Sequence, residues 1–119
     1  MRKNYYPKEL DRMRIHTISR DKMLYNAEAE YDNGSVVVMK GGKINRSNAP
    51  GFKPKKTISS LREKDDLFEN YCYLKEDVAF TSLSDAATFV TGRIANGRIV
   101  WKTENGKYVR YALSAGGDE

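Results

Sequence analysis

Apolar and polar residues alternate in the segment from Met23 to Lys40, which predicts a β-hairpin packed on one side. Asn33-Gly34 lies near the middle of this segment, and both residues tolerate the positive φ angles of a tight hairpin turn. A two-residue turn at this point sets the register of the two strands. The residue pairs on the expected core face are then Tyr31–Val36 and Ala29–Val38.

Two helices are expected after this hairpin. The first runs from residue 57 to about residue 71, because apolar residues recur there at steps of three or four, apart from a polar gap at Lys64-Asp65. The second begins at a capping box, in which the Ser82 hydroxyl accepts the backbone N–H of Asp85 and the Asp85 carboxylate returns a bond. Gly92 is placed to end this helix. The segment 72–80 between the helices is expected to be extended.

A second hairpin is predicted from Ile99 to Leu113, around the turn Asn105-Gly106. With a two-residue turn, Trp101 lies beside Arg110 on one face and forms a cation–π pair with it. Trp101 is also expected to be mostly buried, because tryptophan usually buries most of its area. These elements predict an α+β domain, in which two β-hairpins form a small, mostly antiparallel sheet with two helices packed on it.

The sequence has 119 residues, a length typical of one domain. The expected organisation is a basic N-terminal extension at 1–22, a single α+β domain at 23–113 and a flexible tail at 114–119. No apolar run approaches the roughly 20 residues of a membrane span, and the first residues lack the apolar core of a secretory signal. We therefore expect a cytoplasmic protein without membrane contact.

One cysteine, Cys72, and one histidine, His16, leave few ways to build a catalytic or metal site. A single cysteine excludes an internal disulfide and a multi-cysteine zinc site. His16 has no evident acidic or nucleophilic partner, and the acidic pairs Asp65-Asp66 and Glu76-Asp77 lack the spacing of an EF-hand. We therefore expect no catalytic residue, no metal and no cofactor, and hence no enzyme.

Positive charge is concentrated in one part of the chain. The 21 Lys and Arg residues exceed the 16 Asp and Glu residues, which gives a net charge of +5. Between residues 40 and 64, eight Lys or Arg residues accompany a single acid, and glycines and prolines in the same stretch predict a loop. A basic loop of this kind favours contact with phosphates, and the alternative is a solubilising surface.

The segment from Phe80 to Gly97 has the sequence FTSLSDAATFVTGRIANG, and Trp101-Lys102 and the turn Asn105-Gly106-Lys107 follow it. This series resembles a domain-of-unknown-function family that is often placed C-terminal to GIY-YIG nuclease domains and in restriction-associated proteins. It is also similar to the restriction-enzyme adenine-methylation-associated (RAMA) domain. The upstream segment 36–44 resembles the family's F-V-V-L-K-G-S-K pattern, so the resemblance covers about residues 23–113. The departures from the family pattern are Leu83, Asp85, Ile94 and Arg98, the last of which replaces a Trp.

This resemblance implies a non-catalytic accessory module that handles DNA in bacterial or phage restriction or defence systems. The resemblance also makes Arg93 and Asn96 candidate contacts to nucleic acid, because both lie in the matching loop between Gly92 and Gly97. Asn can read adenine, and Arg can hold phosphate or guanine. A helix end followed by an Asn-Gly turn accounts for the same residues without any ligand.

The expected function is therefore nucleic-acid binding, with DNA, modified or unmodified, or another nucleic acid as the partner. The alternative is a protein-interaction module, such as a phage-encoded effector that docks on a host defence protein. The candidate nucleic-acid-binding residues are Lys40, Lys43, Arg46, Lys53, Lys55 and Lys56 for phosphates, Arg93, Asn96 and Arg98 nearer the bases, and also Lys102 and Arg110.

Overall fold

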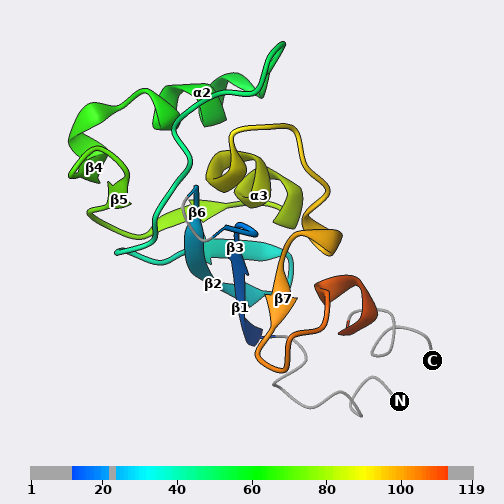
Figure 1. Ribbon diagram of the computed structural model, residues 1–119. Helices are drawn as coiled ribbons and strands as arrows, with labels where there is room; N and C mark the ends of the chain where they lie inside the picture. The colour runs from blue at the N-terminus through cyan, green and yellow to red at the C-terminus, as the bar shows by residue number, and fades with distance from the viewer. Residues whose placement is uncertain (1–11, 22–23, 113–119) are drawn as a thin grey trace.

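The computed structural model describes residues 12–21 and 24–112, and their main feature is an antiparallel sheet with helices on one side (Figure 1). The strand order is β6-β3-β2-β1-β7. In that order the strands are Val78–Phe80, Ser35–Val38, Asn26–Asp32, Arg12–Ile18 and Lys102–Thr103. A separate hairpin pairs β4 (Phe68–Glu69) with β5 (Tyr73–Leu74). The predicted α+β class with an antiparallel sheet is confirmed.

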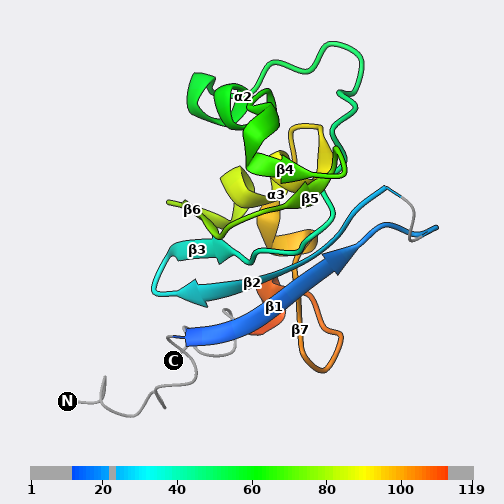
Figure 2. The ribbon, with the colours of Figure 1, turned by 90° about the vertical axis from the view of Figure 1, so that its left-hand side faces the viewer.

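Two α-helices form layers over the sheet. Helix α3 (Leu83–Thr91) packs on β3 and β6, and α2 (Lys56–Arg62) packs on α3. Figure 2 shows α3 between the sheet and α2. The longest helix in the described residues is α3, with nine residues, so no described helix is long enough to span a membrane.

The first hairpin forms as the alternating pattern predicts. Ala29 pairs with Val38 and Tyr31 with Val36, and the turn residues Asn33-Gly34 have φ angles of 52° and 99°. Ala29, Val36 and Val38 are fully buried, because they share the face of the hairpin that belongs to the core, where α3 packs on β3. The local sequence alone was sufficient to define this register.

Strand β1 lies inside the sheet, between β2 and β7. It pairs with β2 along its whole length, from Arg12–Asp32 to Ile18–Asn26, and Ile15 is fully buried in the core. The sheet therefore includes residues 12–18, which the sequence analysis assigned to the basic extension. The exposed face of β1 carries cationic residues, so the alternation of apolar and polar residues in this strand was not recognised from the sequence. Residues 1–11 and 113–119, parts of the predicted extension and tail, lie outside the described residues.

The first predicted helix is shorter than expected, and its predicted part beyond Arg62 is wrong. Helix α2 ends at Arg62, and the chain continues through a 3-10 turn, η2 (Asp65–Leu67), into β4. The break coincides with the polar gap at Lys64-Asp65. Beyond this break, Leu67 lies in the 3-10 turn and Phe68 in β4. Both are buried, but neither lies on the face of a helix.

Helix α3 has the predicted ends. The backbone N–H of Asp85 donates to the Ser82 hydroxyl at 3.0 Å, and Gly92 ends the helix with a φ of 82°. The returned bond of the predicted capping box is not among the described hydrogen bonds. The Asp85 carboxylate instead accepts from Lys55 at 3.0 Å, so it ties the basic loop to α3.

Replacing Ser82 with alanine is expected to lower the free energy of unfolding by about 1 kcal/mol, because one backbone N–H at the start of α3 loses its acceptor. Chemical denaturation measures this change. The matched control is Ser60→Ala on the exposed surface of α2, for which a change within about 0.5 kcal/mol is expected. Equal effects of the two substitutions would show that the Ser82 cap contributes nothing.

The second predicted hairpin is wrong in register and in length. The turn takes three residues, 104–106, with Gly106 at a φ of 86°, so Lys102 bridges Tyr108 instead of facing Val109. The chain then turns helical at 109–112 instead of continuing as a strand. The predicted pair of Trp101 and Arg110 does not form, and Arg110 lies over the ring of Tyr111, with 5.5 Å from its Cζ to the ring centroid.

Trp101 is fully buried, which confirms its predicted place in the core. Its indole Nε1 donates to the carbonyl of Leu83 at 3.1 Å, so the segment after the 3-10 turn η3 (Gly97–Ile99) is joined to the start of α3. The rings of Phe80 and Phe89 lie 5.1 Å apart in the same core.

Candidate functional site

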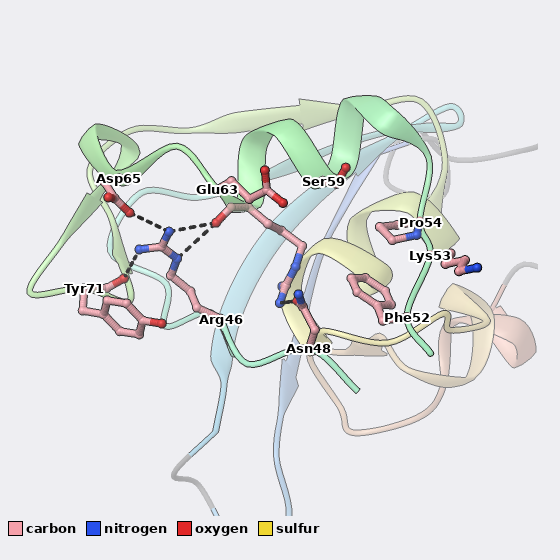
Figure 3. A pocket seen from close by; sticks show the side chains of 10 residues that line it. Arg46, Asn48, Phe52, Lys53, Pro54, Ser59, Glu63, Asp65 and Tyr71 are labelled. Carbon is pink, nitrogen blue, oxygen red and sulfur yellow. Dashed lines mark hydrogen bonds and ion pairs between the residues drawn. The ribbon is translucent and has the colours of Figure 1, made fainter. Parts of the chain in front are cut away.

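A cavity of about 600 Å³ opens between the basic loop and α2 (Figure 3). This volume lies within the range of roughly 300–1,000 Å³ that is typical of ligand pockets. Cationic and aromatic side chains are prominent in its lining. The lining residues are Arg46, Asn48, Phe52, Lys53, Pro54, Ser59, Arg62, Glu63, Asp65 and Tyr71.

Backbone hydrogen bonds hold the basic loop in place beside this cavity. The N–H of Ile44 donates to the carbonyl of Cys72 at 2.8 Å, and the N–H of Asn45 donates to the carbonyl of Val90 at 2.9 Å. At Gly92 an added Cβ would lie 2.4 Å from the Ser47 carbonyl oxygen, so only glycine permits this close approach. The loop is therefore anchored on both the β4–β5 hairpin and the end of α3.

The side chain of Arg46 is 7% exposed and is engaged within the chain. Its guanidinium donates to the carbonyl of Arg62 at 2.9 and 3.2 Å, to the carbonyl of Tyr71 at 2.9 Å and to the Asp65 carboxylate at 3.0 Å (Figure 3). It also lies over the ring of Phe68, with 4.2 Å from Cζ to the centroid. Arg46 thus joins the loop to α2 and the hairpin, and its donors have partners without a phosphate.

Arg62 is 4% exposed and sits at the inner wall of the cavity. Its Nη1 donates to the Phe89 carbonyl at 2.7 Å and its Nη2 to Asn48 Oδ1 at 2.7 Å, whereas Nε has no hydrogen-bond partner. The guanidinium lies 5.2 Å from the ring centroid of Phe52. Burial lowers the pKa of Arg62 below its ordinary value, and the nearby charge of Arg46 lowers it further.

Two exposed tyrosines of the β4–β5 hairpin lie alongside the loop. Tyr71, at the cavity mouth, is 67% exposed, and Tyr73 is 39% exposed. Arg46 Cζ lies 4.7 Å from the ring of Tyr71, and Lys43 Nζ lies 5.9 Å from the ring of Tyr73. We call Lys43, Tyr71 and Tyr73 the tyrosine surface.

The backbone of Tyr71 has a φ of 74°, in the left-handed region. An aromatic residue in this conformation is strained by about 1–2 kcal/mol, and such strain persists only where the surroundings enforce it. The hydrogen bond from Arg46 to the Tyr71 carbonyl is one enforcing contact. It keeps the exposed ring at the mouth of the cavity.

The structure distributes the sequence-predicted site residues over separate parts of the fold. Arg46 and Lys53 line the cavity, and Lys55 and Lys56 lie exposed at the start of α2, where Lys55 pairs with Asp85. Lys40 and Lys43 follow β3. The remaining candidates lie beyond α3: Arg93, Asn96, Arg98, Lys102 and Arg110. Of the eleven candidates, Arg46 and Lys53 line this cavity, where Glu63 and Asp65 lie among the cations.

Asn96 and Arg98 line a second cavity of about 250 Å³, which lies next to the start of α3. Asn96 Oδ1 accepts the backbone N–H of Arg98 at 3.0 Å, so its side chain caps η3. Gly97 packs on the backbone of Leu83, and its N–H donates to the Ser84 hydroxyl at 2.9 Å. The glycines of this loop thus permit close approach within the chain itself, and Arg93 lies exposed outside both cavities.

Lys102 and Arg110 each lie beside a tyrosine near the end of the described chain. Lys102 Nζ is 5.2 Å from the ring centroid of Tyr108, and Arg110 lies over Tyr111. Among residues 12–21 and 24–112, no three His, Cys, Asp or Glu side chains gather as a possible metal-ligand set.

Only Arg46 and Lys53 of the cavity lining were predicted from the sequence, and the most important of the residues not predicted are Arg62, Phe52 and Tyr71. A signal existed for Arg62, because it follows Ile58 by four residues and therefore shares the buried face of α2. A cation on the apolar face of a predicted helix indicates a buried polar contact. Phe52 and Tyr71 carried no comparable signal, since only the folded loop and hairpin bring them to the same cavity.

Comparison with known proteins identifies a family and no individual relative. No curated protein and no solved structure matches the chain. The family model of a domain of unknown function (DUF4357) matches residues 17–112. The description of this family names neither a GIY-YIG nuclease nor a RAMA domain. Because the match covers most of the sequence, the chain belongs to the domain-of-unknown-function family DUF4357.

Proposed function

We propose that the protein is a non-catalytic nucleic-acid-binding module, and that it binds through the tyrosine surface and the adjoining cavity. One observation carries the proposal: the exposed rings of Tyr71 and Tyr73 each lie beside a cation of the basic loop. Proteins that bind single strands combine aromatic rings, on which bases stack, with cations that attract the backbone. The tyrosine surface contains both groups.

The charge around the cavity favours unpaired nucleotides over a duplex. Glu63 and Asp65 lie among the cations, and Arg46 is already engaged, so a long track of phosphates has no continuous partner surface. An unpaired base needs only an open ring to stack on, and Tyr71 offers one. The proposed ligand is therefore a single strand or an unpaired region of DNA or RNA.

The resemblance to restriction-associated proteins adds the proposed setting. The module acts there in bacterial or phage restriction or defence, in the cytoplasm and together with another protein that supplies catalysis. This setting rests on the resemblance alone, whereas the binding surface rests on the contacts of Lys43, Arg46 and the two tyrosines.

Fluorescence anisotropy with labelled oligonucleotides tests the proposal. The full chain is expected to bind single-stranded DNA more tightly than duplex DNA. The logarithm of the affinity is expected to fall with the logarithm of salt concentration by roughly 0.7 unit for each phosphate contacted. Tyr71→Ala is expected to weaken binding roughly 5- to 150-fold, the equivalent of about 1–3 kcal/mol for one stacked base.

The matched control is Tyr111→Ala, since Tyr111 is also exposed and also lies beside an arginine. Its affinity is expected to stay at the wild-type value. A loss of affinity in Tyr111→Ala but not in Tyr71→Ala would place binding elsewhere and overturn the proposed surface. The absence of salt-sensitive binding to any oligonucleotide would overturn the function itself and favour the alternative of a protein-docking module.

A further inference from the structure

No carboxylate of the described residues neutralises the charge of Arg62. Its acceptors in the described residues are the carbonyls of Phe89 and Ser47 and the amide oxygen of Asn48, all of them uncharged. Within the described residues Arg62 forms no ion pair. The Asp65 carboxylate, which lines the same cavity, pairs with Arg46 instead. Three of its five N–H donors have an acceptor, and Nε–H has none.

A buried guanidinium without a counter-ion is unfavourable. Arginine stays protonated at neutral pH even when its pKa is lowered, so it keeps its charge in the folded state. Buried charges in proteins are generally paired with an opposite charge. Among the described residues Arg62 therefore has no anionic partner, and its Nε–H has no acceptor.

We propose that the cavity binds one nucleotide unit, with its phosphate near Arg62 and Lys53 and its base against Phe52 or Tyr71. The cations supply what a phosphate needs, because the guanidinium charge of Arg62 has no counter-ion among the described residues and Lys53 adds a second charge. The two rings flank the same cavity and offer stacking surfaces. The cavity volume suits a ligand of this size.

A free nucleotide and the end of a strand present the same phosphate chemistry. The second source rests on the proposed function, because it requires the chain to bind a polynucleotide. The first does not. Separate probes therefore test the two sources: adenosine 5′-monophosphate against adenosine, and a 5′-phosphorylated oligonucleotide against the same oligonucleotide with a 5′-hydroxyl.

The sharpest variant is Asn48→Asp. Asn48 Oδ1 lies 2.7 Å from Arg62 Nη2, so this nearly isosteric change places a carboxylate directly on the guanidinium. The new carboxylate supplies the missing counter-ion and repels a phosphate. The variant is therefore expected to melt at a higher temperature than the wild type without ligand, and to bind the phosphate roughly tenfold or more weakly.

Thermal unfolding of the full chain with and without ligand measures both effects, since a ligand that binds the folded state raises the melting temperature. Adenosine 5′-monophosphate is expected to raise the melting temperature of the wild type more than adenosine does, and Asn48→Asp is expected to reduce this rise. Lys53→Gln, an exposed position with no hydrogen bond to lose among the described contacts, is expected to reduce it as well. The charge-matched control is Asn105→Asp, in the remote turn after β7, which is expected to retain the full rise.

Equal shifts from adenosine and its monophosphate, or an undiminished shift in both cavity variants, would overturn the site. The oligonucleotide arm separates this failure from failure of the proposed function. If the affinity for the oligonucleotide depends neither on its 5′-phosphate nor on the two cavity substitutions, nucleic-acid binding stands and the phosphate site is overturned. Binding of the mononucleotide without binding of any strand supports the site and overturns the proposed function.

Discussion

Trp101→Ala is expected to lower the free energy of unfolding by about 3–5 kcal/mol, a large share of the about 5–15 kcal/mol that stabilises a typical domain. Trp101 is the largest fully buried side chain of the described residues, and its removal leaves a cavity beside α3. The substitution also removes the donor to the Leu83 carbonyl, which then stays buried without its indole partner. Denaturant titration followed by circular dichroism measures the loss.

Trp101→Phe separates packing from the hydrogen bond. Phenylalanine keeps an aromatic ring in the core but has no N–H, so the Leu83 carbonyl loses its indole donor. The expected loss is about 1–3 kcal/mol, smaller than for alanine. If Trp101→Phe is as destabilising as Trp101→Ala, the hydrogen bond dominates. If Trp101→Ala costs less than about 1 kcal/mol, the residue is not the core element described.

Gly97→Ala is expected to destabilise the domain by about 3 kcal/mol, at the upper end of the range for overpacked sites. A Cβ added at Gly97 would lie 2.2 Å from the carbonyl carbon of Leu83 and 2.3 Å from its oxygen. Backbone atoms at the start of a helix cannot move aside as a flexible side chain can. The substitution therefore forces η3 away from α3 and weakens the Trp101 hydrogen bond to the same carbonyl.

The control is Gly106→Ala, because Gly106 has a φ of 86° but no atom within 4 Å of the added Cβ. Its cost is limited to the left-handed conformation, about 1–2 kcal/mol. Equal losses from the two substitutions would show that the contact with Leu83 carries no energy. The double variant of Trp101→Ala and Gly97→Ala is expected to lose less than the sum of the single losses, since both disturb the same carbonyl.

These two residues explain part of the sequence pattern that resembles the family. Gly97 and Trp101 contact Leu83, Asn96 caps η3, and Ser82 caps α3. Their residue types are required by packing and hydrogen bonding within the chain. This part of the pattern is therefore explained by the fold, and the residues of the proposed binding site lie outside the segment 80–107, in the basic loop, in α2 and in the β4–β5 hairpin.

Local signals predicted the elements that depend on neighbouring residues. The hairpin at Asn33-Gly34 and the Ser82 half of the capping box formed as expected, because a turn and a cap are built from residues a few positions apart. The prediction of the second hairpin was wrong because its turn has one residue more than expected. A three-residue turn shifted Lys102 from Val109 to Tyr108, and this shift separated Trp101 from Arg110.

The sequence by itself determined the α+β class, the first hairpin, helix α3 and the basic character of the loop. Only the tertiary structure decided what the cations of that loop do. Arg46 turns inward to carbonyls of α2 and the hairpin, whereas Lys53 stays exposed at the cavity. The reason is physical: charge and turn propensity are local properties, but burial of a guanidinium depends on which distant backbone carbonyls the fold brings within hydrogen-bonding distance.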